Sequence, residues 1–250
     1  MKEGYFAKVE HDKKREFVIK KLKPVKPEET AEIKELNENY LQVLKSAGVK
    51  LPNTKIIFLK GKKPIPTIIQ PAFKEEELLD NIISKGDKSK VLDAFEKMLE
   101  LNFKVIEASK NSWIPFGFDG TPKNLAMHNG EIYYFDTFPP YIRNKQMIKV
   151  IKTQVRPGFK KISGSIIPSI LKQFFEPPKM IRSAVASSIK RRAEFEKEFK
   201  QIATRIILDH VPEKDAKPYL KFKQSLPTKF NNKIRNFKKL IKPALKKERY

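Results

Sequence analysis

The sequence predicts an α+β protein that begins with a small, mainly antiparallel sheet carrying one helix and continues as a larger helical part. Strand-like runs rich in β-branched and aromatic residues gather in the first 70 residues. After residue 75, apolar residues recur at helical spacing over most of the chain. Asn129-Gly130 separates two further strand-like runs, and Asn-Gly is the strongest short-range signal for a β-hairpin.

The composition limits the class of protein. The chain has 250 residues, of which 40% are hydrophobic, so it can bury a substantial core. It has no cysteine, which excludes disulfide bonds, thiolate metal sites and a cysteine nucleophile. No run approaches the roughly 20 apolar residues of a membrane-spanning helix, and no apolar run follows the first residues as in a secretory signal. We therefore expect a cytoplasmic protein without a transmembrane segment.

The first part of the chain alternates strands and turns around a single helix. Residues 5–10 and 17–22 are strand candidates on either side of a charged turn. Residues 28–47 carry apolar side chains at helical spacing and predict one helix. Two more strands are expected at 54–60 and 67–70.

The second part is mostly helical and contains one hairpin. Its clearest helices are expected at 75–83, 88–109 and 193–209, and its two strands at 125–127 and 132–135. The strands flank the Asn-Gly turn and place the residues before and after the hairpin next to each other.

Positive charge is distributed unevenly along the chain. The net charge is +24, but residues 1–140 hold 24 basic and 21 acidic residues, whereas 141–250 hold 29 basic and 8 acidic residues. Such a field attracts nucleic acid, anionic lipid or phosphorylated substrates, although a solvated lysine-rich surface has the same composition. In residues 221–250, Phe side chains lie among the lysines. This pattern fits a contact with nucleic acid or an anionic membrane, and it also fits an amphipathic helix packed on the core.

Four polar residues form the constellation that points to chemistry. Asp119 and Asn124 lie in the loop before the hairpin, and Asp136 directly follows its second strand. The hairpin returns Asp136 towards Asn124, so a carboxylate and an amide oxygen can share a magnesium ion. With Lys20 on a strand for phosphates and Asp119 for an acceptor hydroxyl, these are the parts needed for phosphoryl transfer. Taken singly, Asp119 also fits a turn residue, Asn124 a strand cap and Asp136 a cap before Thr137.

Several motifs occur in the order and spacing of the protein-kinase-like superfamily, which the chain resembles over residues 4–140. The segments that carry this resemblance are Gly4-Tyr5-Phe6-Ala7-Lys8-Val9 (the end of a glycine-rich loop), Phe17-Val18-Ile19-Lys20 (the strand lysine), Ile68-Ile69-Gln70-Pro71-Ala72-Phe73 (the hinge), Asp119-Gly120-Thr121-Pro122-Lys123-Asn124 (the catalytic loop) and Asp136-Thr137-Phe138 (the metal-binding motif). The passage from Tyr40 through Gly48-Val49 is similar to aminoglycoside and choline kinases.

The resemblance implies a bilobal protein-kinase-like fold that binds ATP and Mg²⁺. Residues 1–70 would form the N-lobe with its sheet and C-helix, the family's first strand being absent; 71–75 would form the hinge, and 76–250 the helical C-lobe with its catalytic-loop hairpin. The implied nucleotide-binding residues are Gly4, Lys20, Glu38, Gln70 and Ala72, with Glu38 or Glu35 as the partner of Lys20. Asn124 and Asp136 would bind magnesium, and Asp119 would be catalytic.

Departures from the family pattern narrow the expected function. Phe118 replaces the His before the catalytic Asp, Thr121 stands where protein kinases often place a lysine, and Thr137-Phe138 replaces Phe-Gly. These features favour a small-molecule or atypical kinase. Because the second part of the chain is basic, we expect a neutral or anionic acceptor rather than an aminoglycoside. The alternative is a pseudokinase scaffold that binds nucleic acid or anionic membrane through residues 221–250.

Overall fold

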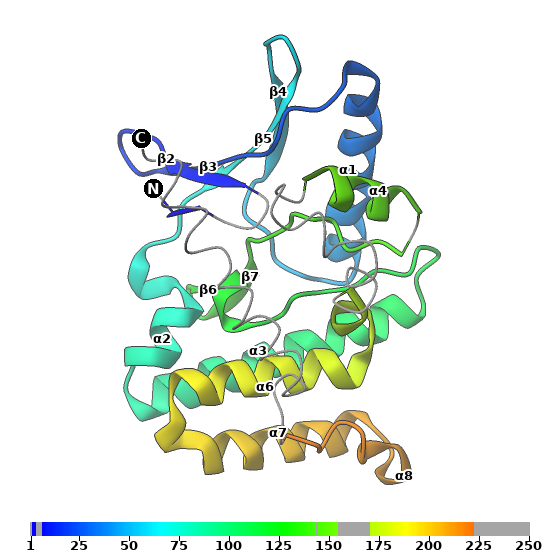
Figure 1. The fold of residues 1–250 in the computed structure, drawn as a ribbon. Helices are drawn as coiled ribbons and strands as arrows, with labels where there is room; N and C mark the ends of the chain where they lie inside the picture. Colours follow the sequence, from blue (N-terminus) through cyan, green and yellow to red (C-terminus); the bar gives the residue numbers. More distant parts are fainter. Residues whose placement is uncertain (1, 4–6, 144, 155–170, 223–250) are drawn as a thin grey trace, which may run out of the picture.

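A computed structural model describes residues 2–3, 7–143, 145–154 and 171–222. Their architecture is α+β, as predicted, with a small antiparallel sheet at one end and a helical part at the other (Figure 1). Gly4 and residues 223–250, on which two of the sequence predictions rest, lie outside the described residues.

The sheet has five strands in the order β1-β2-β3-β5-β4, and every neighbouring pair is antiparallel. The strands are β1 (Lys2–Glu3), β2 (Lys8–His11), β3 (Phe17–Lys21), β4 (Lys55–Leu59) and β5 (Ile65–Pro71). The short β1 consists of two residues, which pair with Val9 and Lys8 of β2. β3 lies in the middle of the sheet, between β2 and β5.

Helix α1 (Thr30–Ser46) follows a 3₁₀ turn, η1 (Pro27–Glu29), and joins β3 to β4. Its inner face carries Ile33, Leu36, Tyr40 and Leu44, all buried, so the helical spacing read from the sequence is confirmed. The helix ends before Gly48, whose φ of +71° is the left-handed conformation that lets a helix stop.

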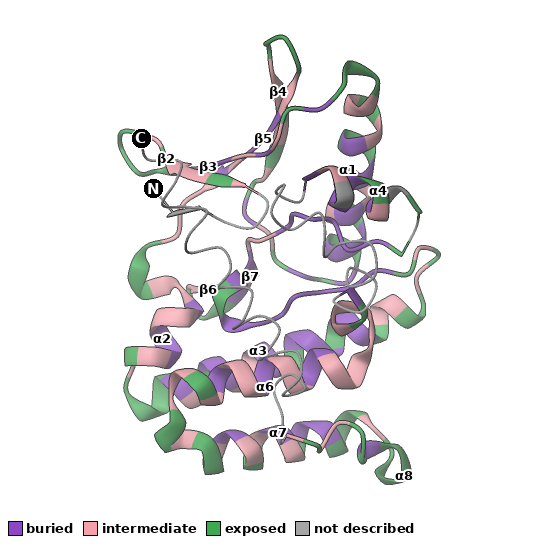
Figure 2. Ribbon diagram, viewed as in Figure 1, coloured by how far each residue is buried: buried purple, intermediate pink, exposed green. Residues whose placement is uncertain are grey.

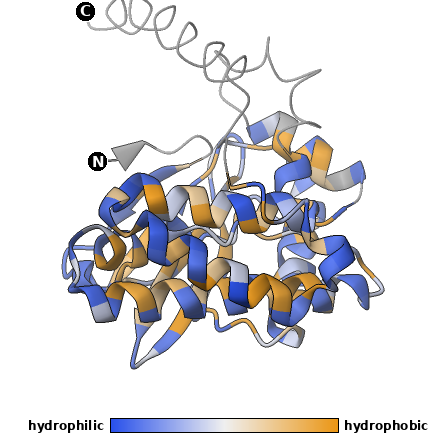
Figure 3. Ribbon diagram, turned by 90° about the horizontal axis from the view of Figure 1, so that it is seen from below, coloured by the Kyte–Doolittle hydropathy of each residue, from blue (hydrophilic) through white to orange (hydrophobic). Residues whose placement is uncertain are grey.

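The helical part is built around the long helix α3 (Lys88–Lys110), which begins where the Asp87 side chain caps the Lys90 N–H. The helices α2 (Leu79–Lys85), α6 (Pro177–Arg191) and α7 (Glu196–His210) pack against α3, and α8 (Glu213–Ala216) follows α7. Purple buried faces turn towards each other in Figure 2, and in Figure 3 the helices show apolar and polar faces along their length. Phe95 of α3 and Phe199 of α7 are fully buried, with ring centroids 4.5 Å apart.

Between the sheet and the helices lies the predicted hairpin, with β6 (Leu125–His128) and β7 (Glu131–Tyr134) (Figure 1). The described residues after β5 also contain three short 3₁₀ turns: η2 (Glu75–Glu77), η3 (Pro122–Asn124) and η4 (Ala193–Phe195). The predicted helix over 193–209 therefore begins as a 3₁₀ turn and becomes α-helical at Glu196.

After the hairpin the chain returns to the sheet end of the molecule, where it forms helix α4 (Lys145–Gln154). The fully buried Gln154 accepts a hydrogen bond from the Lys23 N–H at 2.8 Å, just beyond β3. Lys149 forms an ion pair of 2.7 Å with Glu32 of α1. Within the described residues, no helix is long and apolar enough to cross a membrane.

Candidate functional site

Lys20 and Asp136 form an ion pair between two segments 116 residues apart. Lys20 lies on the central strand β3 and is 8% exposed. Its Nζ is 2.9 Å from Asp136 Oδ1 and donates a second hydrogen bond to the Phe135 carbonyl at 3.1 Å. The structure therefore brings together the strand lysine and the carboxylate after the hairpin, two residues that the sequence analysis assigned to one site without expecting them to pair.

The hairpin also places Asn124 beside Asp136. Its register pairs Leu125 with Tyr134, and the Phe135 N–H donates to the Asn124 carbonyl at 3.1 Å. Asn124 and Asp136 are thus neighbours across the base of the hairpin. The Asn124 amide nitrogen donates to the Asp119 carbonyl at 3.0 Å, which leaves its amide oxygen as the atom that can face a cation.

Asp119 belongs to the same group of residues through this contact with Asn124, and it is 7% exposed. Its Oδ1 accepts a hydrogen bond from the Thr121 hydroxyl at 2.9 Å, and its Oδ2 is 3.3 Å from Lys123 Nζ. Both contacts are local, within four residues of Asp119, and they also fit the interpretation as a turn residue. Asp136 pairs with a lysine 116 residues away, a contact that the interpretation as a cap before Thr137 does not explain.

Two buried residues that the sequence analysis did not assign to the site hold the Asp119 loop in place by hydrogen bonds to its backbone. Asn102 of α3 donates to the Gly120 carbonyl at 3.0 Å, and Tyr40 of α1 donates to the Gly117 carbonyl at 3.1 Å. A Cβ at Gly120 would lie 2.3 Å from Asn102 Oδ1, so only glycine fits there. Tyr40 already falls on the apolar stripe of its predicted helix, which is the signal that could have revealed it. A polar residue on the buried stripe of the helix at 88–109 is the corresponding signal for Asn102.

Three buried tyrosines are influenced by the charges of the two carboxylates. Burial raises the pKa of the hydroxyls of Tyr40, Tyr134 and Tyr141, and the negative charges of Asp119 and Asp136 raise it further. The three hydroxyls therefore keep their protons at neutral pH.

An aromatic patch of half-buried side chains adjoins the ion pair: Phe73, His128, Tyr133 and Phe135. The Phe73 ring centroid is 5.6 Å from that of Tyr133 and 6.0 Å from that of Phe135. The Phe135 ring centroid is 5.7 Å from Lys20 Nζ. A planar ligand stacked on this patch would therefore lie next to the only lysine that contacts Asp136 within the described residues.

Glu38 and Glu35 do not join the site. Both are exposed, and Glu38 is 3.9 Å from Lys34 on the next turn of α1. The expected partnership with Lys20 is corrected, because Lys20 pairs with Asp136 instead. The physical reason is the position of each residue around the helix. Asn37 and Tyr40 lie on the buried face of α1, whereas Glu35 and Glu38 lie on its exposed face.

The residues expected at the hinge are near β3. Gln70 is 2% exposed, lies opposite Val18 of β3, and its Oε1 has no hydrogen-bond partner. The Ala72 N–H donates to the Glu16 carbonyl at 2.8 Å and is therefore already in use. Of the remaining predictions, Gly4 lies outside the described residues, as does all of 221–250 except its first two residues.

The described residues contain no group of three or more His, Cys, Asp or Glu side chains arranged to hold a metal ion. The site instead offers one carboxylate, Asp136, and one amide oxygen, Asn124. Magnesium is commonly held by one or two such protein oxygens together with substrate phosphates. The donor set present, one carboxylate and one amide oxygen, is therefore compatible with a magnesium ion completed by other ligands.

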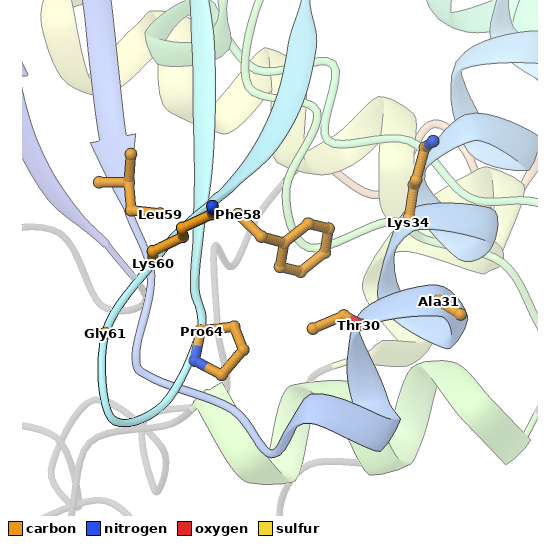
Figure 4. A pocket seen from close by; sticks show the side chains of 8 residues that line it. All are labelled: Thr30, Ala31, Lys34, Phe58, Leu59, Lys60, Gly61 and Pro64. Atoms are coloured by element: carbon orange, nitrogen blue, oxygen red, sulfur yellow. The ribbon is translucent and has the colours of Figure 1, made fainter.

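A surface hollow of about 540 Å³ lies away from this site, between the start of α1 and the β4–β5 turn (Figure 4). The ring of Phe58 points towards α1, while the Lys34 side chain extends along the helix. None of the predicted site residues lines the hollow.

Fold and site together define an α+β protein whose central strand lysine is paired with a carboxylate after a β-hairpin. A family model, described as a family of unknown function (DUF6206), matches residues 3–240. The chain therefore belongs to this family. Comparison with curated proteins and with solved structures gave no match.

Proposed function

We propose that this protein is an ATP-dependent phosphotransferase with a bilobal protein-kinase-like arrangement, acting in the cytoplasm on a hydroxyl of a neutral or anionic acceptor. Residues 1–70 would be its N-lobe, 71–75 its hinge and 76–250 its C-lobe. The observation that carries the proposal is the ion pair of Lys20 and Asp136, with Asn124 beside Asp136 at the base of the hairpin.

The site residues fall into distinct roles. Lys20 would leave Asp136 and bind the nucleotide phosphates, since a lysine ammonium is a compact charge with three donors. Asn124 and Asp136 would hold magnesium, which neutralises charge on the phosphates when bound. The aromatic patch would stack the base, and the Gln70 Oε1 atom, which has no partner, is a polar group close to β3.

Asp119 would orient the acceptor hydroxyl and accept its proton. It lies in a loop that Asn102 and Tyr40 hold in place by hydrogen bonds to backbone carbonyls. Phosphoryl transfer depends mostly on positioning and charge stabilisation, so a rigid carboxylate is what this role requires.

The first test is nucleotide binding measured as a thermal shift with ATP, with and without Mg²⁺. At 100 times its dissociation constant, a ligand stabilises the folded state by about 2.7 kcal/mol. We expect a magnesium-dependent shift in the wild type that Asp136→Ala abolishes. The matched control is Asp93→Ala, which removes an exposed carboxylate bound to Lys97 on α3. A shift that Asp136→Ala leaves unchanged would contradict the proposal.

A pseudokinase that binds ATP without transferring phosphate is the second candidate. It is favoured by the Asp119 carboxylate, because Thr121 and Lys123 occupy both of its oxygens. Magnesium-dependent ATP binding without ADP formation under any acceptor screen would select this function. Retention on RNA or anionic vesicles that is lost on deleting residues 223–250 would then identify the partner of the basic segment.

A further inference from the structure

A second, smaller hollow of about 210 Å³ lies where the end of α3 meets the start of α6. None of the residues assigned to the candidate site lines this smaller hollow, so the inference drawn from it does not depend on the proposed function. Most of its wall is apolar and is formed by Val105, Ile106, Phe116, Phe175, Pro177 and Met180.

Hydrogen bonds fix the segments that form the wall. The Ser109 hydroxyl donates to the Phe116 carbonyl at 2.6 Å and accepts from the Phe116 N–H at 3.2 Å. The Arg143 N–H donates to the Pro115 carbonyl at 2.8 Å. Phe116 itself is 3% exposed. The smaller hollow is therefore formed by the fold itself, as is usual for sites that bind small molecules.

Two cationic side chains line the smaller hollow at its open side, Lys110 and Arg143, both of which are exposed. Within the residues that the structure describes, neither forms an ion pair. Glu176, which lies between two lining residues in sequence, is already paired with Lys179 at 2.6 Å. The mouth of an apolar hollow thus carries positive charge that the fold does not neutralise, and an anion would complement it.

Arg143 is the cation whose geometry suits an oxyanion. Its guanidinium carbon is 5.2 Å from the ring centroid of Phe175. A guanidinium presents its N–H donors as a planar fork that matches the two oxygens of a carboxylate. Lys110 lies in the last turn of α3, where a cation also balances the helix dipole, so we assign the directional contact to Arg143.

We propose that the smaller hollow is a binding site for a small apolar carboxylate. The apolar body would lie against Phe116 and Met180, and the carboxylate would bind the Arg143 guanidinium. The volume of 210 Å³ is below the roughly 300–1,000 Å³ of pockets for drug-sized ligands. It equals the volume of about seven water molecules at about 30 Å³ each. A single ring or a short acyl chain fits this space, whereas a nucleotide is too large.

The test is isothermal titration calorimetry on the full chain with three probes: phenylacetate, phenylacetamide and acetate. Phenylacetamide has the shape of phenylacetate without its charge, and acetate has the charge without the ring. We expect phenylacetate to bind. Phenylacetamide should bind at least about tenfold more weakly, because it loses the charge-assisted hydrogen bonds to the guanidinium. Acetate should also bind at least about tenfold more weakly, because it buries no ring.

Variants of Arg143 locate the binding site. Arg143→Met should weaken phenylacetate binding at least about tenfold and leave phenylacetamide binding unchanged, which also shows that the hollow is intact. Arg143→Lys should recover only part of the affinity, since it keeps the charge without the planar fork. The matched control is Arg205→Met, which removes the same charge from α7, where Arg205 is 2.8 Å from Glu96. This control should bind phenylacetate as the wild type does.

Three results would overturn the inference. The first is a wild type that binds no phenylacetate in a millimolar titration. The second is equal affinity for phenylacetate and phenylacetamide, because the site would then not select a carboxylate. The third is an equal effect of Arg143→Met and Arg205→Met, whether both weaken binding or neither does, because the anion would then not be bound at Arg143.

Discussion

Basic side chains connect distant segments in two regions of this protein, the candidate site and the end of α6, and their surroundings differ. At the end of α6, Arg191 forms an ion pair with Asp80 of α2. Arg192 donates to the carbonyls of Ser84 and Gly86, each at 3.1 Å, where α2 ends. The last carbonyls of a helix lack partners within it, so Arg192 satisfies groups that the fold itself leaves open.

The candidate site keeps hydrogen-bonding capacity that the fold does not use. Among the described residues, the buried side-chain atoms without a partner belong to Asn37, Gln70, Asn102, Tyr134 and Thr137. None of these residues lies on α6 or α7, and Thr137 directly follows Asp136. Buried polar groups without partners are uncommon in proteins. Positive charge is common to both regions, so what distinguishes the candidate site is its buried polar atoms without partners.

Among variants that test this comparison, we expect the largest loss of stability from Gly120→Ala in the candidate site. The added Cβ would lie 2.3 Å from Asn102 Oδ1 and 2.4 Å from the Phe118 ring, both buried. Because overpacking of a buried position is costly, we expect the free energy of unfolding to fall by about 2–3 kcal/mol in urea titrations. Gly61→Ala is the control, since its Cβ would meet only the Lys63 carbonyl, at 3.3 Å. Equal stability of both variants would contradict the packing argument.

A pair of variants tests the comparison directly. Arg192→Met should lower the free energy of unfolding by about 2 kcal/mol, because it removes charge-assisted hydrogen bonds to two carbonyls, and it should leave nucleotide binding intact. Lys20→Met should do the reverse: its partner Asp136 is 39% exposed and can be hydrated, so stability should change by less than about 1 kcal/mol. Nucleotide-induced thermal shifts should vanish in Lys20→Met only. If Arg192→Met also abolished the shift, the two regions would not be functionally distinct.

Tyr40→Phe probes how the site region is fixed to α1. The variant removes the hydrogen bond to the buried Gly117 carbonyl, and we expect a loss of about 1 kcal/mol in chemical denaturation. Tyr219→Phe, on a half-buried ring stacked near Phe103, should change stability by less than half as much. If Tyr40→Phe left the free energy of unfolding unchanged, the loop would not depend on this hydrogen bond.

The smallest expected effect concerns the Glu77–His128 contact at the edge of the aromatic patch, where Nδ1 and Oε1 are 2.5 Å apart. Partial burial alone would raise the pKa of Glu77, but the hydrogen bonds from His128 and from the Lys74 N–H outweigh it and hold the pKa below its usual value. A lowered folded-state pKa gives stability that is present above the unfolded pKa and is lost as the pH falls through the folded value. Glu77→Gln should therefore destabilise the protein slightly at pH 7, and the difference should shrink below about pH 4. A difference that grows on acidification would reverse this interpretation.

Much of the local structure was predictable from the sequence. Helical spacing fixed the positions of α1, α3 and α7, because the buried face of a helix recurs about every 3.6 residues. Asn129-Gly130 predicted the hairpin, since both residues adopt the positive φ values that its turn requires, +50° and +77°. The sequence spacing of Asn124 and Asp136 then predicted that they would be neighbours, as observed.

Partners across long distances were decided only by the tertiary structure. Spacing could not show that Lys20 would bind Asp136 rather than Glu38, because the choice depends on how β3, the hairpin and α1 pack together. The positions of Asn102 and Tyr40 behind the Asp119 loop depend on packing in the same way. A sequence determines which residues share a face of one element, whereas the contact between two faces is fixed by the packing of the whole core.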